Sequence, residues 1–397
     1  MKRENGFSLI ELMVAMAVLL IIAAAAVGAL IQAQHVTQAV GMQANTQQNL
    51  RAGMHSLVHD LMQAGEGIPN AGVTIPTTAG GVSAIARPGP GGPAAFFPAA
   101  FTALPQLTPG WQLGEDAKTV NPVTLAVQDG LLKTDIITIL YVDDTLVSSA
   151  LGPGGIPAPK LSDYPVVQAA PAAPVCAGAL NAAGTTVTLA PTCFTLPGGP
   201  TPLAKGDLIM FHNANGSALE LVTNVAGTVL TFAAGDPAGL NGTGLPNGTV
   251  TQLNVTATPT SISRVWMVTY YVDSNTFPNR PQLIRQVNYP NYPSVAAATY
   301  PAQPVADIIE NLAFSYDLVN SADPVGTYPL GPGDAPQPVL PDTTFNIRAV
   351  NVTLAGRSEY PYTATTTPQF FRNNLSTQVS VRSMAFVNAF PTPATLP

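Results

Sequence analysis

Charged residues are scarce in this chain of 397 residues. They make up 9% of the sequence, against ~25% in an average globular protein. The 15 Lys and Arg residues are scattered, with no basic cluster beyond the first three residues, and the formal net charge is −7. This composition argues against nucleic-acid binding through a basic patch. The polar surface must therefore come mainly from Thr, Ser, Asn and Gln, as is common in secreted and cell-surface proteins.

Residue sets typical of catalysis or metal binding are also missing from the sequence. It has no Gly-x-Ser-x-Gly elbow, no Walker-type phosphate loop and only four His residues. His55 and His59 have the i, i+4 spacing of two ligands on one helix face, but no third ligand accompanies them, and we interpret them as surface residues. Asp143 and Asp144 end an expected strand, where a carboxylate pair indicates a turn more often than a calcium site. We therefore expect no enzyme, no cofactor and no metal.

Only two cysteines occur, Cys176 and Cys193, in a stretch rich in Pro, Ala and Thr. If this part of the chain is exported, an even pair in a loop-rich region indicates a disulfide. Closing a loop of that size would stabilise the fold by ~3 kcal/mol on chain-entropy grounds. Two unpaired thiols remain the alternative. A metal site is not indicated, because no Cys-x-x-Cys motif or nearby His completes a ligand set.

Proline is absent before Pro69, and this allows one long helix at the N-terminus. Residues 7–31 are apolar except for Ser8 and Glu11. At ~1.5 Å per residue they are long enough to cross a hydrocarbon core of ~30 Å. Two basic residues precede this segment, so the positive-inside tendency predicts a single-pass protein with a cytoplasmic N-terminus and an exported C-terminal part.

An amphipathic pattern continues the helix beyond the apolar segment. Apolar residues recur at i, i+4, i+7, i+8 and i+11 and predict one stripe facing a globular domain: Leu50, Met54, Leu57, Val58 and Leu61. Polar residues fill the other side: Gln43, Asn45, Gln47, Gln48, Asn49, Arg51, Ser56 and Asp60. Gly65, Gly67 and Pro69 then predict the helix end, so we expect one helix from Phe7 to about Ala64.

From residue 70 the composition is that of an antiparallel β structure with long loops. Segments rich in Pro, Gly and Ala predict loops at 87–110, 151–175 and 323–342. Runs rich in β-branched and aromatic residues predict strands at 123–127, 135–142, 185–190, 207–212, 218–225, 228–233, 249–256, 261–272, 282–287, 312–318, 346–356 and 376–386. A turn near Ala226-Gly227 predicts a hairpin, and 304–311 a short helix or turn.

The fold class expected from these patterns is α+β. A long N-terminal helix, transmembrane in its first half and amphipathic in its second, packs on a large, mostly antiparallel β domain. We expect this extracytoplasmic domain to span residues 66–397.

One carboxylate lies inside the segment expected to cross the membrane. Glu11 follows the sequence Gly6-Phe7-Ser8-Leu9-Ile10. An ionisable group in hydrocarbon costs ~2.5–3.5 kcal/mol on insertion scales and usually has a partner. Cleavage between Gly6 and Phe7 would create such a partner, because the new α-amino group would lie one helical turn from Glu11. The six residues before the cut are short, basic and end in Gly.

This N-terminus resembles the class III leader of type IV prepilins and type II secretion pseudopilins. The resemblance implies that residues 1–6 are a leader, that a prepilin peptidase cuts after Gly6 and methylates the amine of Phe7, and that Glu11 is the assembly glutamate that pairs with that amine. Residues 7–65 would form the pilin helix, with residues 7–31 in the membrane.

Two other interpretations of the N-terminus remain. An ordinary secretory signal peptide would be cleaved in the alanine-rich stretch 23–29, but a removable signal gains nothing from the carboxylate of Glu11. A plain anchor helix with an accidental Glu leaves the Gly6-Phe7 junction unexplained.

Several later segments resemble the PilW-type minor pilins. They are Lys205-Gly206-Asp207-Leu208-Ile209 and the ranges 265–272, 283–288, 307–317 and 375–386, whereas 70–204 matches no pattern. This resemblance implies a minor pilin-like subunit of a type IV pilus, held in the inner membrane before assembly and at the cell surface afterwards. Its partners would be the prepilin peptidase, other major and minor pilins, the inner-membrane assembly platform and membrane lipid. A J-type pseudopilin of a type II secretion system and a pilin-anchored adhesin or binding module are the alternatives.

Overall fold

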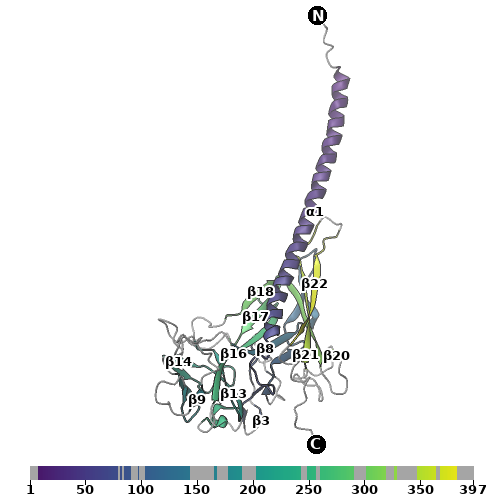
Figure 1. Ribbon diagram of the computed structural model, residues 1–397. Coiled ribbons are helices and arrows are strands. Elements are labelled where there is room, and N and C mark those ends of the chain that lie inside the picture. Colours follow the sequence, from purple (N-terminus) through teal and green to yellow (C-terminus); the bar gives the residue numbers. More distant parts are fainter. Residues whose placement is uncertain are drawn as a thin grey trace, which may run out of the picture.

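The computed structural model describes residues 8–78, 81–82, 85–90, 97, 103–143, 165–167, 178–189, 203–242, 248–255, 260–289, 301–318, 326–328, 347–363 and 367–381. Within these residues, one long helix lies on a domain of mostly antiparallel sheets, which confirms the α+β fold class (Figure 1). The N-terminal half of the helix extends away from the domain, and its C-terminal half lies against it.

Helix α1 runs from Leu9 to Gln63 without interruption, as the absence of proline predicts. Just beyond it, Gly65 and Gly67 have φ values of 78° and 70°, a left-handed conformation that other L-residues rarely adopt. A Cβ on Gly67 would also lie 2.8 Å from the Cβ of Val142. The two glycines therefore turn the chain sharply out of the helix and bring it against strand β8 (Ile136–Val142).

The expected apolar stripe of α1 is the face that packs on the β domain. Leu50, Met54, Leu57 and Leu61 are buried, and Val58 packs against them partly buried. The assignment of two other residues to the polar side was wrong. Asp60 is 2% exposed, and Ser56 is half-buried with its hydroxyl 2.8 Å from that of Tyr270. The reason is that the domain surface under α1 extends beyond the apolar stripe and carries polar partners at its margin.

Twelve strands form the largest sheet in the described residues. Along one path the order is β13 (Gly216–Leu221), β12 (Leu208–Asn213), β16 (Thr260–Asp273), β9 (Pro165–Val167), β10 (Gly178–Leu180), β11 (Thr186–Leu189), β15 (Val229–Thr231) and β14 (Asn224–Ala226). Off this path, β8 joins β16 to β5 (Leu107–Gly110), and β17 (Gln282–Val287) joins β16 to β18 (Gln303–Asp307). The pairing of β9 with β10 is parallel, and the other pairs are antiparallel.

Strand β16 has partners along both of its edges and lies at the centre of this sheet. Its first half pairs with β12 and its second half with β17 on one edge, while β8 pairs along the other edge. Because side chains alternate along a strand, Val268 and Tyr270 enter the core under α1, whereas Val265 and Met267 enter a second core on the opposite face. One strand thus contributes side chains to cores on both faces of the sheet.

A second sheet of four antiparallel strands completes the surface on which α1 lies. Its order is β20 (Gly326–Tyr328), β19 (Ile309–Leu318), β21 (Ile347–Arg357) and β22 (Arg372–Ser380). Helix α1 packs across β22, β21, β18 and β8. Leu57 of the helix shares one hydrophobic core with Phe314 and Val352 of this sheet and with Leu283 of the larger sheet. The helix therefore packs where the two sheets meet.

The distal lobe, at the lower left of Figure 1 around β9, β13 and β14, has a core of its own. The rings of Phe211 and Phe232 meet edge to face there, 5.7 Å apart. Outside the two larger sheets, short strands form separate antiparallel pairs. They are β1 (Val73–Thr74) with β4 (Ala103–Leu104), β2 (Thr77–Thr78) with β3 (Gly81–Val82), and β6 (Asp116–Val120) with β7 (Val127–Lys133).

Several strand expectations were wrong in detail. Residues 249–256 include a 3-10 helix, Val250–Leu253, because a short apolar run alone does not distinguish the two conformations. Residues 304–311 form β18 and the start of β19 instead of a helix. The strand expected at 123–127 is mostly the turn before β7. The strand expected at 376–386 begins earlier, as β22, and residues 382–386 lie outside the described residues. The hairpin at Ala226-Gly227 is present and joins β14 to β15.

Candidate assembly interface

The N-terminus of α1 is closed by a capping box. Ser8 is the N-cap, and its hydroxyl accepts a hydrogen bond from the backbone N–H of Glu11 at 3.3 Å. The Glu11 carboxylate in turn accepts one from the backbone N–H of Ser8 at 2.9 Å. This reciprocal pair satisfies two of the donors that every helix N-terminus leaves open. It also holds the Glu11 carboxylate beside the peptide that links residue 8 to the expected cleavage junction.

The two residues of that junction, Gly6 and Phe7, lie outside the described residues. Their expected roles in cleavage and methylation therefore stay predictions, as does the charge pair between Glu11 and the Phe7 amine. The same is true of the expected disulfide, because Cys176 and Cys193 are also outside the described residues.

The first half of α1 presents apolar side chains that stay exposed among the residues that the structure describes. From Leu9 at 78% to Ile31 at 47%, the large apolar residues of this stretch are exposed. The segment is long and apolar enough to cross a membrane, and none of its most apolar window is buried in the chain. A contiguous apolar surface of this size is unfavourable in water. An exposed apolar surface of this kind fits a membrane anchor.

The second half of α1 is fastened to the β domain by a buried ion pair. Arg285 on β17 donates two hydrogen bonds to the Asp60 carboxylate, from Nε at 2.6 Å and from Nη2 at 3.1 Å. The hydroxyl of Tyr270 on β16 donates a third at 2.7 Å, and that of Tyr141 on β8 a weaker one at 3.4 Å. Groups from β8, β16 and β17 thus converge on a single carboxylate of the helix.

The surroundings of this pair favour the charged form of Arg285 and the protonated form of the two tyrosines. Burial, followed by the nearby Asp60 charge, raises the pKa of both Tyr270 and Tyr141, so both phenols keep the protons that they donate. Burial alone would lower the pKa of Arg285, but the hydrogen bonds and charge of Asp60 raise it above its ordinary value. A bidentate pair with two added donors has one preferred geometry, so it sets the position of α1 along the sheet.

A glycine lets the helix approach the domain closely. A Cβ on Gly53 would lie 2.9 Å from the Cβ of Ala306 on β18 and 3.0 Å from Cδ2 of Leu283 on β17. Contacts this short require the neighbouring atoms to move. Glycine is unfavourable inside a helix by ~1 kcal/mol relative to alanine, and here the close packing explains its place.

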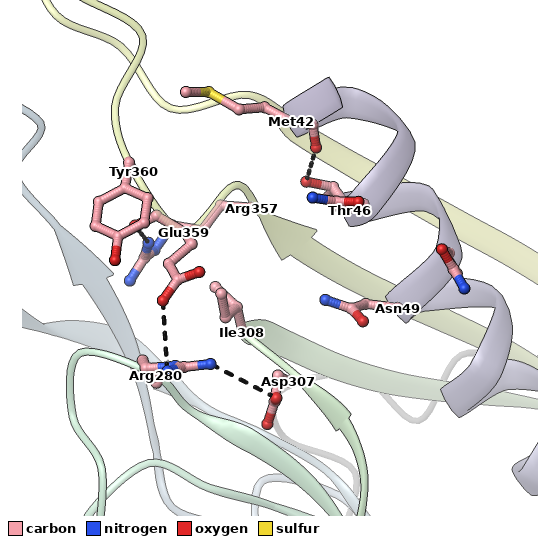
Figure 2. Close-up of a pocket in the computed structure, with 11 residues that line it drawn as sticks. Met42, Thr46, Asn49, Arg280, Asp307, Ile308, Arg357, Glu359 and Tyr360 are labelled. Atoms are coloured by element: carbon pink, nitrogen blue, oxygen red, sulfur yellow. Dashed lines mark hydrogen bonds and ion pairs between the residues drawn. The ribbon is translucent and has the colours of Figure 1, made fainter. Parts of the chain in front are cut away.

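A polar pocket of about 420 Å³ opens between α1 and the β domain just before the buried stripe begins (Figure 2). Met42, Thr46 and Asn49 line it from the helix, facing charged residues of the domain. Those charges are paired among themselves. Arg280 lies 3.7 Å from Asp307 and 3.4 Å from Glu359, and Arg357, also in the lining, lies 3.2 Å from Glu310. The pocket therefore offers no uncompensated charge to a ligand.

The other side chains considered as metal ligands are His55, His59 and Asp143. His55 and His59 lie on the exposed face of α1, and no three possible metal ligands gather anywhere in the described part of the chain. Asp143 is buried and forms a salt bridge with Arg264, whose guanidinium also lies over the ring of Trp266. Asp143 is thus an ion-paired residue at the end of β8.

Sequence reasoning missed the contribution of Asp60, Arg285 and Gly53. One signal was present: Asp60 is the single acidic residue between Glu11 and Glu66, and it directly precedes the buried Leu61. An acidic residue at the margin of an apolar stripe can have a buried partner, but the partner's identity depends on tertiary contacts.

Comparison with known proteins bears on the N-terminal end. Residues 1–27 match the family described as the prokaryotic N-terminal methylation motif. This match supports a type IV pilin-like or pseudopilin protein, and such a motif implies processing by a prepilin peptidase. Together with the apolar helix, it supports anchoring in a membrane before assembly. No curated protein and no solved structure matched the chain.

Proposed function

We propose that this chain is a minor pilin-like subunit of a type IV pilus, processed at its leader and incorporated through α1. The observation that carries the proposal is the division of α1 into two parts. Residues 46–61 pack against the domain, whereas the apolar part, most of which lies within the methylation motif at residues 1–27, is exposed. Such a helix can lie in lipid first and among other subunits' helices afterwards.

The proposed step is assembly and not catalysis. After cleavage, the Phe7 amine of one subunit and the Glu11 carboxylate of a neighbour would meet among packed helices. Either charge is costly to bury alone, so their pairing favours one register of the helices. A large β domain would hinder dense packing as a repeating subunit, and for this reason we propose a minor role, in priming assembly or near the filament tip.

A pair of substitutions at Glu11 separates charge from helix capping. Glu11→Gln keeps an oxygen that can accept from the Ser8 N–H, as the capping box allows, whereas Glu11→Val removes both functions. We expect both variants to insert in the membrane and both to be lost from sheared filaments. Recovery of Glu11→Gln in filaments at the wild-type level would contradict the charge-pair mechanism and leave only a capping role.

The expected cleavage has its own test. Replacing Gly6 with a bulky residue such as Leu is expected to leave an uncleaved precursor. Mass spectrometry of the wild-type protein should show a chain that begins at a methylated Phe7. A mature chain that begins within 23–29 would instead indicate an ordinary signal peptide, and the filament role would be withdrawn.

The J-type pseudopilin remains the second candidate, because the methylation motif that matches residues 1–27 suits both a type IV pilus and a type II secretion system. Site-specific photo-crosslinking from an exposed α1 position, for example Val40, distinguishes the two in cells. Adducts with pilus subunits support the proposed function, and adducts with secretion pseudopilins support the alternative.

A further inference from the structure

The connection between β21 and β22 continues their hairpin beyond the sheet. The Ser358 N–H donates to the carbonyl of Phe371 at 2.8 Å. Further out, the Tyr362 N–H donates to the carbonyl of Gln369 at 2.7 Å, and the Gln369 N–H donates back at 3.2 Å. We name the described residues of this extension, 358–363 and 367–371, the aromatic arm. Its cross-strand hydrogen bonds give it a defined direction.

That direction is along α1 toward its apolar half. At the base, a Cβ on Gly356 would lie 3.3 Å from Leu50 of the helix. Tyr360 then lines the pocket of Figure 2 beside α1. Beyond it, the ring of Tyr362 meets the ring of His35 edge to face, with 6.5 Å between centroids. From residue 50 to residue 35 the helix rises ~22 Å, so the arm covers this length of α1.

The arm therefore reaches the level at which α1 would leave the membrane. The apolar segment ends at Ile31, and His35 is ~6 Å further along the helix axis. The polar headgroup region extends ~5–7 Å beyond each side of a hydrocarbon core of ~30 Å. Tyr362, packed on His35, lies at the depth of the headgroups when residues 9–31 occupy the core.

The chemistry of the arm suits that layer. Residues 359–372 include four aromatic residues, whereas the whole chain is 7% aromatic, and no charged residue occurs from 360 to 371. The rings of Tyr362 and Phe371 lie 5.4 Å apart, and both are only partly buried. Aromatic residues with one apolar and one polar end gather at membrane–water interfaces, because each end finds its preferred environment there.

We propose that the aromatic arm is a lipid-contacting surface that lies in the headgroup layer of the membrane before assembly. It would form a second attachment beside α1 and restrict how the β domain tilts on the bilayer. The proposal rests on the membrane-spanning role of α1 proposed above, and its test separates the two.

The test uses tryptophan as a depth probe in the full-length protein reconstituted in phosphatidylcholine vesicles. The lipids carry bromine, a fluorescence quencher, either near the headgroup or deep in the acyl chain. Thr363→Trp is placed at the exposed outer part of the arm, and Tyr360→Trp nearer its base. Leu20→Trp reports the span, and Ala226→Trp, exposed in the β14–β15 turn of the distal lobe, is the control. The parent protein, with its own two Trp residues, supplies the baseline.

We expect Thr363→Trp to be quenched roughly twofold more by shallow than by deep bromine, as for an interfacial residue. Shallow bromine should quench Tyr360→Trp less than Thr363→Trp. It should quench Ala226→Trp no more than the parent protein. Leu20→Trp should respond mainly to deep bromine. If Leu20→Trp is quenched but Thr363→Trp behaves like Ala226→Trp, the arm proposal is overturned and the span survives. If Leu20→Trp is not quenched, both fail.

Discussion

Removal of Arg285 is the sharpest perturbation of the link between α1 and the β domain. In Arg285→Met, the carboxylate of Asp60 loses two charge-assisted hydrogen bonds while it stays 98% covered, since the residue is 2% exposed. Breaking a buried pair from one side costs ~3–5 kcal/mol, because the remaining charge is left unpaired. Asp60 would keep the hydrogen bond from Tyr270, so we expect the lower end, ~3 kcal/mol.

The reverse variant should be milder. Asp60→Asn keeps an oxygen that can accept from Arg285, and the Arg285 side chain is 21% exposed and can be partly hydrated. We expect a loss of ~1–2 kcal/mol. Because the two residues are in contact, the double variant should be more stable than the sum of the single effects predicts, with a coupling of ~1–3 kcal/mol.

Two measurements on the full-length protein in detergent micelles check this reasoning. The guanidinium midpoint reports stability, and hydrogen–deuterium exchange of residues 46–61 reports whether α1 detaches locally. Arg372→Met is the matched control, because Arg372 is 48% exposed and its partner Glu310 also lies close to Arg357. A surface pair of this kind should contribute less than ~1 kcal/mol. The proposed role of the Asp60–Arg285 pair would be refuted if Arg285→Met and Arg372→Met lowered stability equally, or if the coupling between Asp60 and Arg285 were near zero.

Two further predictions concern packing and pH. Gly53→Leu should push α1 away from β17 and β18, because even a Cβ has no room there. We expect the free energy of unfolding to fall by ~1–3 kcal/mol and hydrogen exchange in residues 46–61 to become faster. The control Gly41→Leu should be tolerated, because nothing lies near its Cβ position. Burial raises the pKa of Glu220 well above its ordinary 4.5, so the folded state holds a proton that the unfolded state releases, and wild-type stability should fall as pH rises above ~4.5. Glu220→Gln should reduce this loss, although not abolish it, because burial also raises the pKa of Asp135. If midpoints at pH 5 and pH 8 differ equally in both proteins, Glu220 does not contribute to the loss.

Local patterns of the sequence were sufficient for the helix and for most strands. The absence of proline before Pro69, the apolar periodicity and the glycines after residue 64 together specified α1, because helix formation depends on residues within one or two turns of each other. Alternation of side chains located β16 and β21 for a similar reason. Where the pattern was short, as at 249–256 and 304–311, local information was insufficient, and tertiary pairing decided the conformation.

The N-terminal signature likewise belongs to the sequence alone, since recognition by a peptidase and insertion in a membrane depend on a contiguous segment. Only the tertiary structure decided which surfaces meet. It shows that Asp60 is buried against Arg285, that the small size of Gly53 allows close packing on β17 and β18, and that the aromatic arm extends along α1 to His35. The contact between Asp60 and Arg285 alone joins residues that are 225 positions apart. No local pattern encodes these contacts, because a side chain's partner is determined by the packing of the whole domain.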